Sequence, residues 1–86
     1  MILRPTLVLI GGGATIERSK VLSVIPNTNS LPLRTYRKFM AERGMVVDVT
    51  QGRKVKSFIL TDSNHMFLSS VGHETLKQRL ESDDYE

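Results

Sequence analysis

Three cations lie within four positions near the middle of the sequence, where Arg53, Lys54 and Lys56 follow the pair Gln51-Gly52. A tight turn needs only small or φ-permissive residues such as this pair, so the turn itself does not require the clustered like charges. Their mutual repulsion is relieved when a polyanion supplies the opposite charge. The cluster therefore predicts a surface that faces a polyanion, and a merely solvated charged face is the competing interpretation.

The distribution of charge along the chain supports a local basic surface. Residues 34–56 contain seven cations and two carboxylates, which gives +5 there, although the whole chain carries +3. The remainder therefore sums to −2. Four carboxylates, at Glu81, Asp83, Asp84 and Glu86, make the segment 81–86 a short acidic tail.

Other residue types that could do chemistry form no recognisable site. The chain has no cysteine and two histidines, His65 and His73. The stretch that starts at His73 departs from the His-Glu-x-x-His zinc pattern, because Lys77 stands where the second ligand should be. Asp62 and Ser63 precede His65, but neighbouring turn residues usually cap backbone amides rather than align as base and nucleophile. We therefore expect no catalytic residue, no metal and no cofactor, and a protein that is not an enzyme.

The glycine run Gly11–Gly13 follows an apolar segment, where a phosphate-binding loop would lie. It lacks the Gly-Lys-Ser/Thr ending of such loops, and the Gly-x-Gly-x-x-Gly spacing breaks at Ile16. The chain is also too short for a dinucleotide-binding fold. We predict that these glycines form a flexible hairpin turn.

The elements that must position the basic cluster are short strands with one central helix. Turn residues and hairpin-like runs divide the chain, and we expect an α+β fold with a small, mostly antiparallel sheet. Strands are predicted at Thr6–Ile10, Lys20–Ile25, 45–50, 55–61 and Met66–Ser70, and a short C-terminal helix at Glu74–Leu80. Strands 45–50 and 55–61 are predicted to pair as a hairpin around Gln51-Gly52, with Asp48 paired to Arg43 or Arg53.

The central helix is predicted to start at an N-cap on Asn29 or Ser30 and to end at Gly44. Pro32 suits its first turn. Apolar residues recur at helical spacing and are expected to face the core, namely Leu33, Tyr36, Phe39 and Met40. Charged residues are expected mostly on the opposite face, namely Arg34, Arg37, Lys38 and Glu42.

The run Phe58–Leu60 places apolar side chains on both faces of its strand. The central helix can cover one face, and a chain of 86 residues has little left to cover the other. A second subunit is therefore expected there, with Phe58 and Leu60 at the oligomer interface.

The chain is predicted to be one intracellular domain, residues 1–80, followed by the acidic tail 81–86. The apolar run Leu7–Ile10 is far shorter than the roughly 20 residues that cross a bilayer, and no signal-peptide pattern follows it. The lack of cysteine fits a reducing cytoplasm. We expect no contact with a membrane.

Two stretches resemble a known family. Residues 42–69 read ERGMVVDVTQGRKVKSFILTDSNHMFLS, and ETLKQRL follows at 74–80. Arg-Gly-Met, Asp-x-Thr-x-Gly-Arg and Asp-Ser-x-His-x-x-Leu-Ser occur here in the order found in the bacterial RemA family of extracellular matrix regulatory proteins. The resemblance runs from about Leu7 to Leu80.

This resemblance implies a cytoplasmic transcriptional activator of biofilm-matrix genes that binds repetitive upstream DNA without a helix-turn-helix. It also implies a fold similar to LytTR DNA-binding domains and closed, octamer-like homo-oligomeric rings around which double-stranded DNA wraps. The DNA-contacting arginines of the family match Arg53, Lys54 and Lys20. Lysine at positions 20 and 54 keeps the charge but lacks the bidentate fork of arginine, which favours phosphate contact over base reading. Lys56 belongs to the same cluster, and Arg18 and Arg34 are further candidates.

Two other classes of function compete with a DNA-binding regulator. A single-strand RNA reader would need exposed aromatic platforms, and most aromatic residues here are expected in the core. The other class is a protein without a regulatory target, either an architectural nucleic-acid-binding protein or a purely structural assembly protein whose cations pair with the acidic tail of a neighbouring copy. Deletion of residues 81–86 separates the last case, because loss of assembly favours it and tighter DNA binding favours a regulator.

Overall fold

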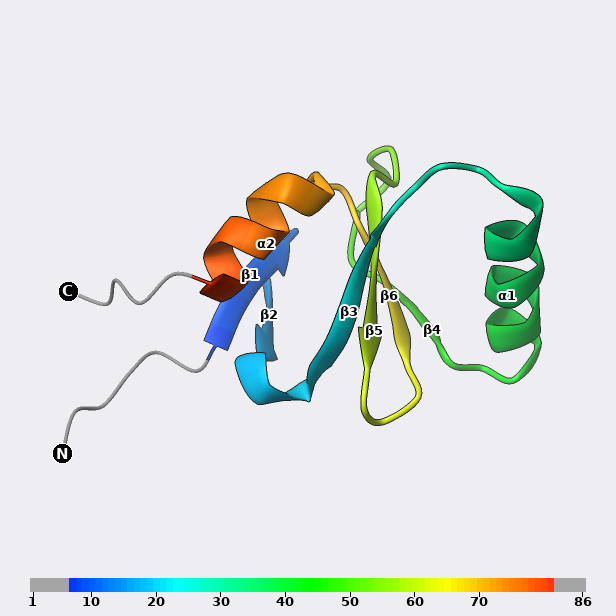
Figure 1. The fold of residues 1–86 in the computed structure, drawn as a ribbon, viewed down its shortest axis with the longest axis horizontal. Coiled ribbons are helices and arrows are strands. Elements are labelled where there is room, and N and C mark those ends of the chain that lie inside the picture. Colours follow the sequence, from blue (N-terminus) through cyan, green and yellow to red (C-terminus); the bar gives the residue numbers. More distant parts are fainter. Residues whose placement is uncertain (1–6, 82–86) are drawn as a thin grey trace, which may run out of the picture.

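The computed structural model describes residues 7–81 and has the expected α+β composition (Figure 1). Thr6 of the first predicted strand and residues 82–86 of the acidic tail lie outside the described residues. The elements are β1 Leu7–Gly11, β2 Ala14–Glu17, a 3-10 turn η1 Arg18–Lys20, β3 Val21–Pro26, α1 Leu31–Glu42, β4 Val46–Asp48, β5 Ser57–Thr61, β6 Met66–Ser69 and α2 His73–Glu81. The glycine run is a hairpin turn between β1 and β2, and Lys20 ends the 3-10 turn instead of starting a strand.

The central sheet has four strands in the order β3-β5-β6-β4, so the predicted hairpin between 45–50 and 55–61 is wrong. β6 lies between β4 and β5, and it pairs with β4 in parallel and with β5 in antiparallel fashion. The predicted turn at Gln51-Gly52 does form. Both residues have positive φ, and the Arg53 N–H donates to the Thr50 carbonyl at 3.1 Å. The strands it joins separate because β5 forms a closer hairpin with β6, through the tight turn at 62–65. The sheet is still mostly antiparallel.

The helix α1 begins and ends as its sequence predicts. The Ser30 hydroxyl, and not Asn29, caps it by accepting the Leu33 N–H at 3.4 Å, and Pro32 lies in the first turn. Gly44 follows the C-cap with φ 71°, a conformation that glycine adopts readily.

The face that α1 turns to the sheet is narrower than predicted. Leu33 and Met40 are buried, but Tyr36 is 40% exposed and Phe39 is 47% exposed. Arg37, expected on the solvent face, lies over the Phe58 ring with its guanidinium carbon 5.6 Å from the ring centroid. Only the row of α1 that contains Leu33 and Met40 is buried against the sheet. The Arg37 side chain, with its cation–π contact to Phe58, lies where an aromatic side chain of α1 was expected.

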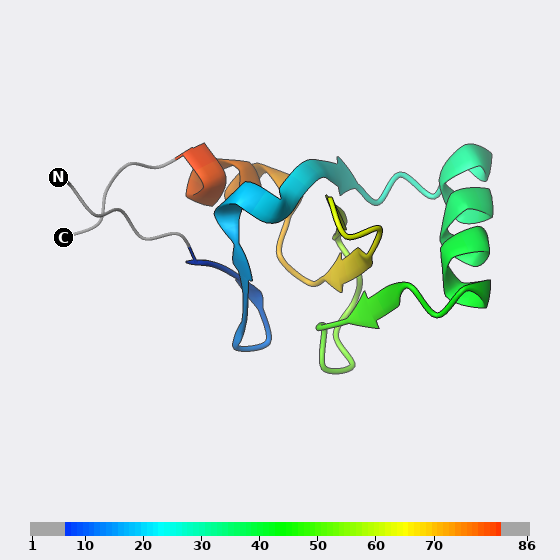
Figure 2. The same cartoon turned by 90° about the horizontal axis from the view of Figure 1, so that it is seen from below.

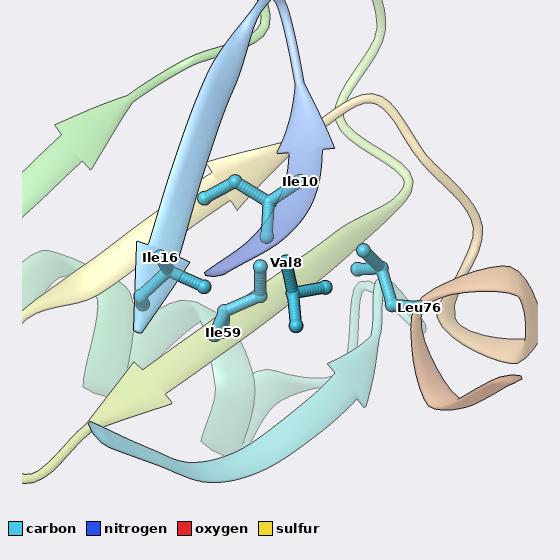
Figure 3. Close-up of a cluster of buried hydrophobic side chains, with 5 residues drawn as sticks. All are labelled: Val8, Ile10, Ile16, Ile59 and Leu76. Carbon is cyan, nitrogen blue, oxygen red and sulfur yellow. The ribbon is translucent and has the colours of Figure 1, made fainter. Parts of the chain in front are cut away.

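One face of the sheet packs on α1, and the other packs on the β1–β2 hairpin and α2 (Figure 1). Alternation along β5 sends Phe58 toward α1 and Ile59 toward the hairpin, and each is 1% exposed. The first core cluster comprises Leu33, Met40, Phe58, Met66 and Leu68, and the second comprises Val8, Ile10, Ile16, Ile59 and Leu76 (Figure 3).

The chain therefore covers both faces itself, and the expectation that a second subunit must cover one of them is wrong. Residues 14–17, which the sequence left unassigned, complete the cover as β2. Phe58 offers no free side chain for an oligomer interface, because α1 and β6 already bury it, while Leu60 is half-buried.

Two buried serines fix the second layer to the sheet. The Ser69 hydroxyl donates to the Ile10 carbonyl at 2.6 Å, and the Ser57 hydroxyl donates to the Val71 carbonyl at 2.7 Å. Both serines are fully buried, so loss of either bond would leave a buried carbonyl unsatisfied. Within residues 7–81, no helix is long and apolar enough to cross a membrane.

Candidate nucleic-acid interface

The basic cluster lies on an irregular segment, residues 49–56, that passes the end of β6 between β4 and β5; we call it the basic loop. Arg53, Lys54 and Lys56 are exposed on it. Among the residues that the structure describes, no carboxylate lies within salt-bridge distance of these three cations. The loop therefore presents three positive charges to solvent that no carboxylate of residues 7–81 compensates.

Asp48 fixes the start of the basic loop. Its Oδ1 accepts the Thr50 N–H at 2.8 Å and the Thr50 hydroxyl at 2.6 Å. These two bonds favour the charged carboxylate and hold the pKa of Asp48 below its usual value of 3.8. Within the described chain, its partner is thus Thr50 two residues away, and the predicted ion pair with Arg43 or Arg53 is wrong.

The far end of the basic loop is held by Asn27, directly after β3, and by β6. The Asn27 side-chain amide donates to the Val55 carbonyl at 3.0 Å, and the Asn27 N–H donates to the Lys56 carbonyl, also at 3.0 Å. The Lys56 N–H donates to the Ser69 carbonyl at 2.8 Å. Backbone bonds on both sides of Lys56 leave its side chain free to point outward.

The tip of the basic loop is held by the glycine turn of the β1–β2 hairpin. The Gln51 side-chain amide donates to the Gly12 carbonyl at 3.1 Å. Gly12 has φ 59°, and a Cβ there would overlap the Val49 carbonyl oxygen. In Figure 2, the hairpin tip and the basic loop project from the same side of the molecule. The glycine run does not match a phosphate-binding loop, but Gly12 allows the hairpin turn to pack closely against the basic loop.

Lys20 does not join the basic loop. The register pairs Val21 with Thr61 and Pro26 with Ser57, so Lys20 and the loop lie at opposite ends of β3, roughly 20 Å apart along the strand. The Lys20 carbonyl accepts the Asp62 N–H at 2.9 Å, and its ammonium lies 4.0 Å from the Asp62 carboxylate. Both side chains are largely exposed, so this ion pair contributes little to stability.

The two further candidates lie in two other surroundings. Arg18 is in η1, and its guanidinium donates to the Leu80 carbonyl at 2.7 Å, which fixes η1 to the end of α2. Arg34 is exposed on α1. The structure thus brings together Arg53, Lys54 and Lys56, and places Lys20, Arg18 and Arg34 elsewhere.

Sequence reasoning missed the residues that hold the basic loop in shape, chiefly Gly12, Asn27 and Gln51. They come from three separate parts of the chain, and only the Asp48-x-Thr50 spacing carried a local signal, typical of an Asx turn. No group of three or more His, Asp or Glu side chains in the described part of the chain could hold a metal ion.

The sequence is similar to a family of regulatory proteins. The family model named RemA-like, described as extracellular matrix regulatory protein A-like, matches residues 7–80. A relative from Nitratidesulfovibrio vulgaris strain DP4 is 42% identical over 91% of this chain and 90% of its own. One from Maridesulfovibrio salexigens is 41% identical over 96% of this chain and 95% of its own. A third, from Fervidobacterium nodosum, is 40% identical over 85% of this chain and 77% of its own. All three carry the name "Putative regulatory protein".

Proposed function

Since the chain belongs to the RemA-like family of regulatory proteins, we propose that it is a cytoplasmic DNA-binding transcriptional regulator. It engages repetitive upstream DNA through the basic loop, as an activator of biofilm-matrix genes. Ring assembly, DNA wrapping and a likeness to LytTR domains are parts of the same proposal.

The observation that carries the proposal is the basic loop itself. Three exposed cations stand on a backbone that is bonded to β3, β6 and the glycine turn. A fixed loop loses little conformational entropy when it meets a phosphate, so more of the Coulombic attraction remains as affinity. Like charges held close together without described counter-charges favour a polyanionic partner over a solvated surface.

The mode of contact follows from the residue types. Lysines and a single arginine on a loop suit phosphate oxygens, which fix a protein on the duplex without reading its sequence. Each subunit then contributes weak, nonspecific affinity. An assembly that repeats the contact along one duplex gains affinity by avidity, so long or repetitive DNA binds best.

The position of Lys20 suits a second, separate phosphate contact. At roughly 20 Å from the loop, it would meet a different part of the DNA backbone from Arg53 and Lys54. This geometry suits DNA that follows the length of the sheet better than DNA held at one point.

RNA binding is the weaker alternative, although two of the aromatic residues expected in the core do not lie there. Tyr36 and Phe39 are exposed, not buried. They lie on α1, however, and not on the basic loop, so they offer no stacking platform beside the cations. A purely structural protein, whose loop cations pair with the acidic tail of another copy, remains the alternative that the experiment must separate.

The test is binding to long duplex DNA by Arg53→Ala/Lys54→Ala, with oligomeric state measured by light scattering. The control is Lys38→Ala/Lys77→Ala, which removes two exposed lysines from α1 and α2 and the same net charge. We expect the loop variant to lose most of its affinity on all long duplexes while its mass stays that of the parent, and the control to bind nearly normally. Equal binding by the loop variant and the parent would refute the proposal. Loss of assembly in the loop variant would favour the structural alternative.

A further inference from the structure

The large apolar side chains that the described chain leaves exposed gather mainly in two places. One is the outer side of α1, with Leu31, Tyr36 and Phe39; the other is the outer side of β1, with Leu7 and Leu9. Leu22 is also exposed, and it lines a separate cleft between β3 and α2. Single exposed apolar side chains are common on protein surfaces, but a group of them on one face indicates an interaction surface.

On α1, these side chains form a shallow groove of about 630 Å³, lined by Leu31, Pro32, Thr35, Tyr36 and Phe39. The Tyr36 and Phe39 rings stack with centroids 6.5 Å apart. The Arg43 guanidinium lies 4.0 Å from the Phe39 centroid and borders the groove. We call this the helix groove. Its position is fixed, because Leu33 and Met40, two turns apart on the same helix, are anchored in the core on the opposite side.

On the hairpin, alternation separates two rows of β1. Val8 and Ile10 point into the core, while Leu7 and Leu9 point outward, 60% and 48% exposed. The Arg79 guanidinium donates to the Leu9 carbonyl at 2.8 Å and holds this strand against α2. We call Leu7 and Leu9 the leucine row. It is an apolar ridge on the outer side of β1.

The two surfaces lie at opposite ends of an elongated subunit. Its longest dimension is 44 Å, against 23 and 21 Å across. Figure 1 shows α1 at one end and the β1–β2 hairpin with α2 at the other. The helix groove and the leucine row of one chain therefore cannot meet each other.

Charge favours contact between copies in the same sense. α1 and its C-cap carry Arg34, Arg37, Lys38 and Arg43 against Glu42 alone. At the opposite end of the subunit, α2 carries Glu74 and Glu81 against Lys77 and Arg79, and the sequence after Glu81 holds Asp83, Asp84 and Glu86 and no cation. A head-to-tail contact joins the basic end of one copy to the end of the next at which α2 ends and three carboxylates follow in sequence.

We propose that the helix groove of one copy receives the leucine row of the next copy. The contact is heterologous, so each subunit uses one surface for each of two neighbours, and repetition closes a ring or continues as a filament. The proposal rests on the assembly invoked under Proposed function, and it names the surfaces that build it. They differ from Phe58 and Leu60, which the sequence favoured.

The test uses one variant in each surface, Phe39→Glu and Leu9→Glu, with Leu22→Glu as the matched control. All three place a carboxylate at an exposed apolar position. We expect Phe39→Glu and Leu9→Glu to reduce the assembly to the 9.7 kDa subunit, and Leu22→Glu to keep the mass of the parent. Tyr36→Glu and Leu7→Glu form a second pair, for use if circular dichroism shows that a first variant has not folded.

Mixing the two variants gives the sharper result. Phe39→Glu keeps an intact leucine row and Leu9→Glu keeps an intact helix groove, so a mixture can form one good contact and no more. We expect a 1:1 dimer of the mixed variants in mass photometry or analytical ultracentrifugation, while each variant alone stays monomeric. A dimer of Leu9→Glu alone would indicate groove-to-groove pairing and overturn the proposal, as would a mixture that stays monomeric.

Failure here is distinguishable from failure of the DNA-binding proposal. If the parent assembles but Phe39→Glu and Leu9→Glu assemble equally well, the named surfaces are wrong, while binding to long DNA is unaffected. If the surfaces are right but the basic loop does not bind DNA, the mixed dimer still forms and no variant shifts a long duplex. A parent that is monomeric at micromolar concentration overturns the contact altogether.

Discussion

The side-chain amide of Gln51 donates a hydrogen bond to the carbonyl of Gly12 across 39 positions of sequence, at 3.1 Å. This bond joins the tip of the basic loop to the tip of the N-terminal hairpin. Beside it, the Gly12 backbone approaches the Val49 carbonyl so closely that no side chain fits between them. The position of the cations at 53–56 therefore depends on a glycine at 12.

Gly12→Ala should weaken both the fold and DNA binding. Alanine at φ 59° costs about 1–2 kcal/mol, and its Cβ would also push against the Val49 carbonyl. We expect a lower melting temperature and, at temperatures where the variant is folded, a lower affinity for long duplex DNA, because the loop must move away from the hairpin.

Gly13→Ala is the matched control. Gly13 has a similar φ, 78°, but a Cβ there meets no atom within 4 Å. Its loss of stability should come from backbone strain alone, and the DNA affinity of the folded variant should stay near that of the parent. Equal losses of affinity in both variants would show that the contact with Val49 does not position the loop.

Asp48 should make stability depend on pH in the acid range. Its pKa in the folded chain lies below 3.8, because the Thr50 hydroxyl and N–H bond to the charged carboxylate. A depressed pKa stabilises the fold fully above 3.8, and this stabilisation is lost as pH falls below 3.8 through the folded value. In urea unfolding, the difference between the parent and Asp48→Asn should thus be constant from neutral pH down to about 4 and shrink below that. A difference that does not change with pH would show that charge on Asp48 is irrelevant.

The local elements could be read from the sequence because their signals are local. Ser30, Pro32 and Gly44 mark the ends of α1, and Gln51-Gly52 makes the turn that its residue types require. The cations at 53–56 are exposed as their charge demands. Each of these features depends on a few neighbouring residues.

The sequence did not predict which strands pair or which side chains of α1 are buried, because both depend on residues far away in the chain. Alternation in β4 and β5 is compatible with pairing to each other or to β6, and the burial of Met66 and Leu68 between them decides the outcome. In the same way, helical spacing grouped Phe39 with Met40, but the sheet buries one of the two. The separation of Lys20 from the basic loop follows from strand register, which periodicity does not give.

Lys20 and Arg53 should contribute to DNA binding independently. They lie at opposite ends of β3, and residues this far apart without shared partners usually have additive effects, within about 0.5 kcal/mol. We expect the losses of binding free energy in Lys20→Ala and Arg53→Ala to sum in the double variant. Arg53 and Lys54 are neighbours and can compensate for each other, so this pair should deviate from additivity. A large coupling between Lys20 and Arg53 would mean that both meet the same phosphate, which the register does not allow within one subunit.

The dependence of affinity on salt should count the phosphate contacts. If Arg53, Lys54 and Lys20 each neutralise one phosphate, log affinity should fall with log salt concentration at a slope of about −2.7 per engaged subunit. Arg53→Ala/Lys54→Ala leaves one of these contacts, so its slope should drop to about −0.9 per subunit. The measurement is fluorescence anisotropy on one long duplex over a range of salt concentrations, with subunit number fixed by light scattering on the same samples. Lys38→Ala/Lys77→Ala removes equal charge from the helices and should keep the parental slope. If both double variants lower the slope alike, binding follows net charge and not the basic loop, and the loop cations are no more than solvated charges.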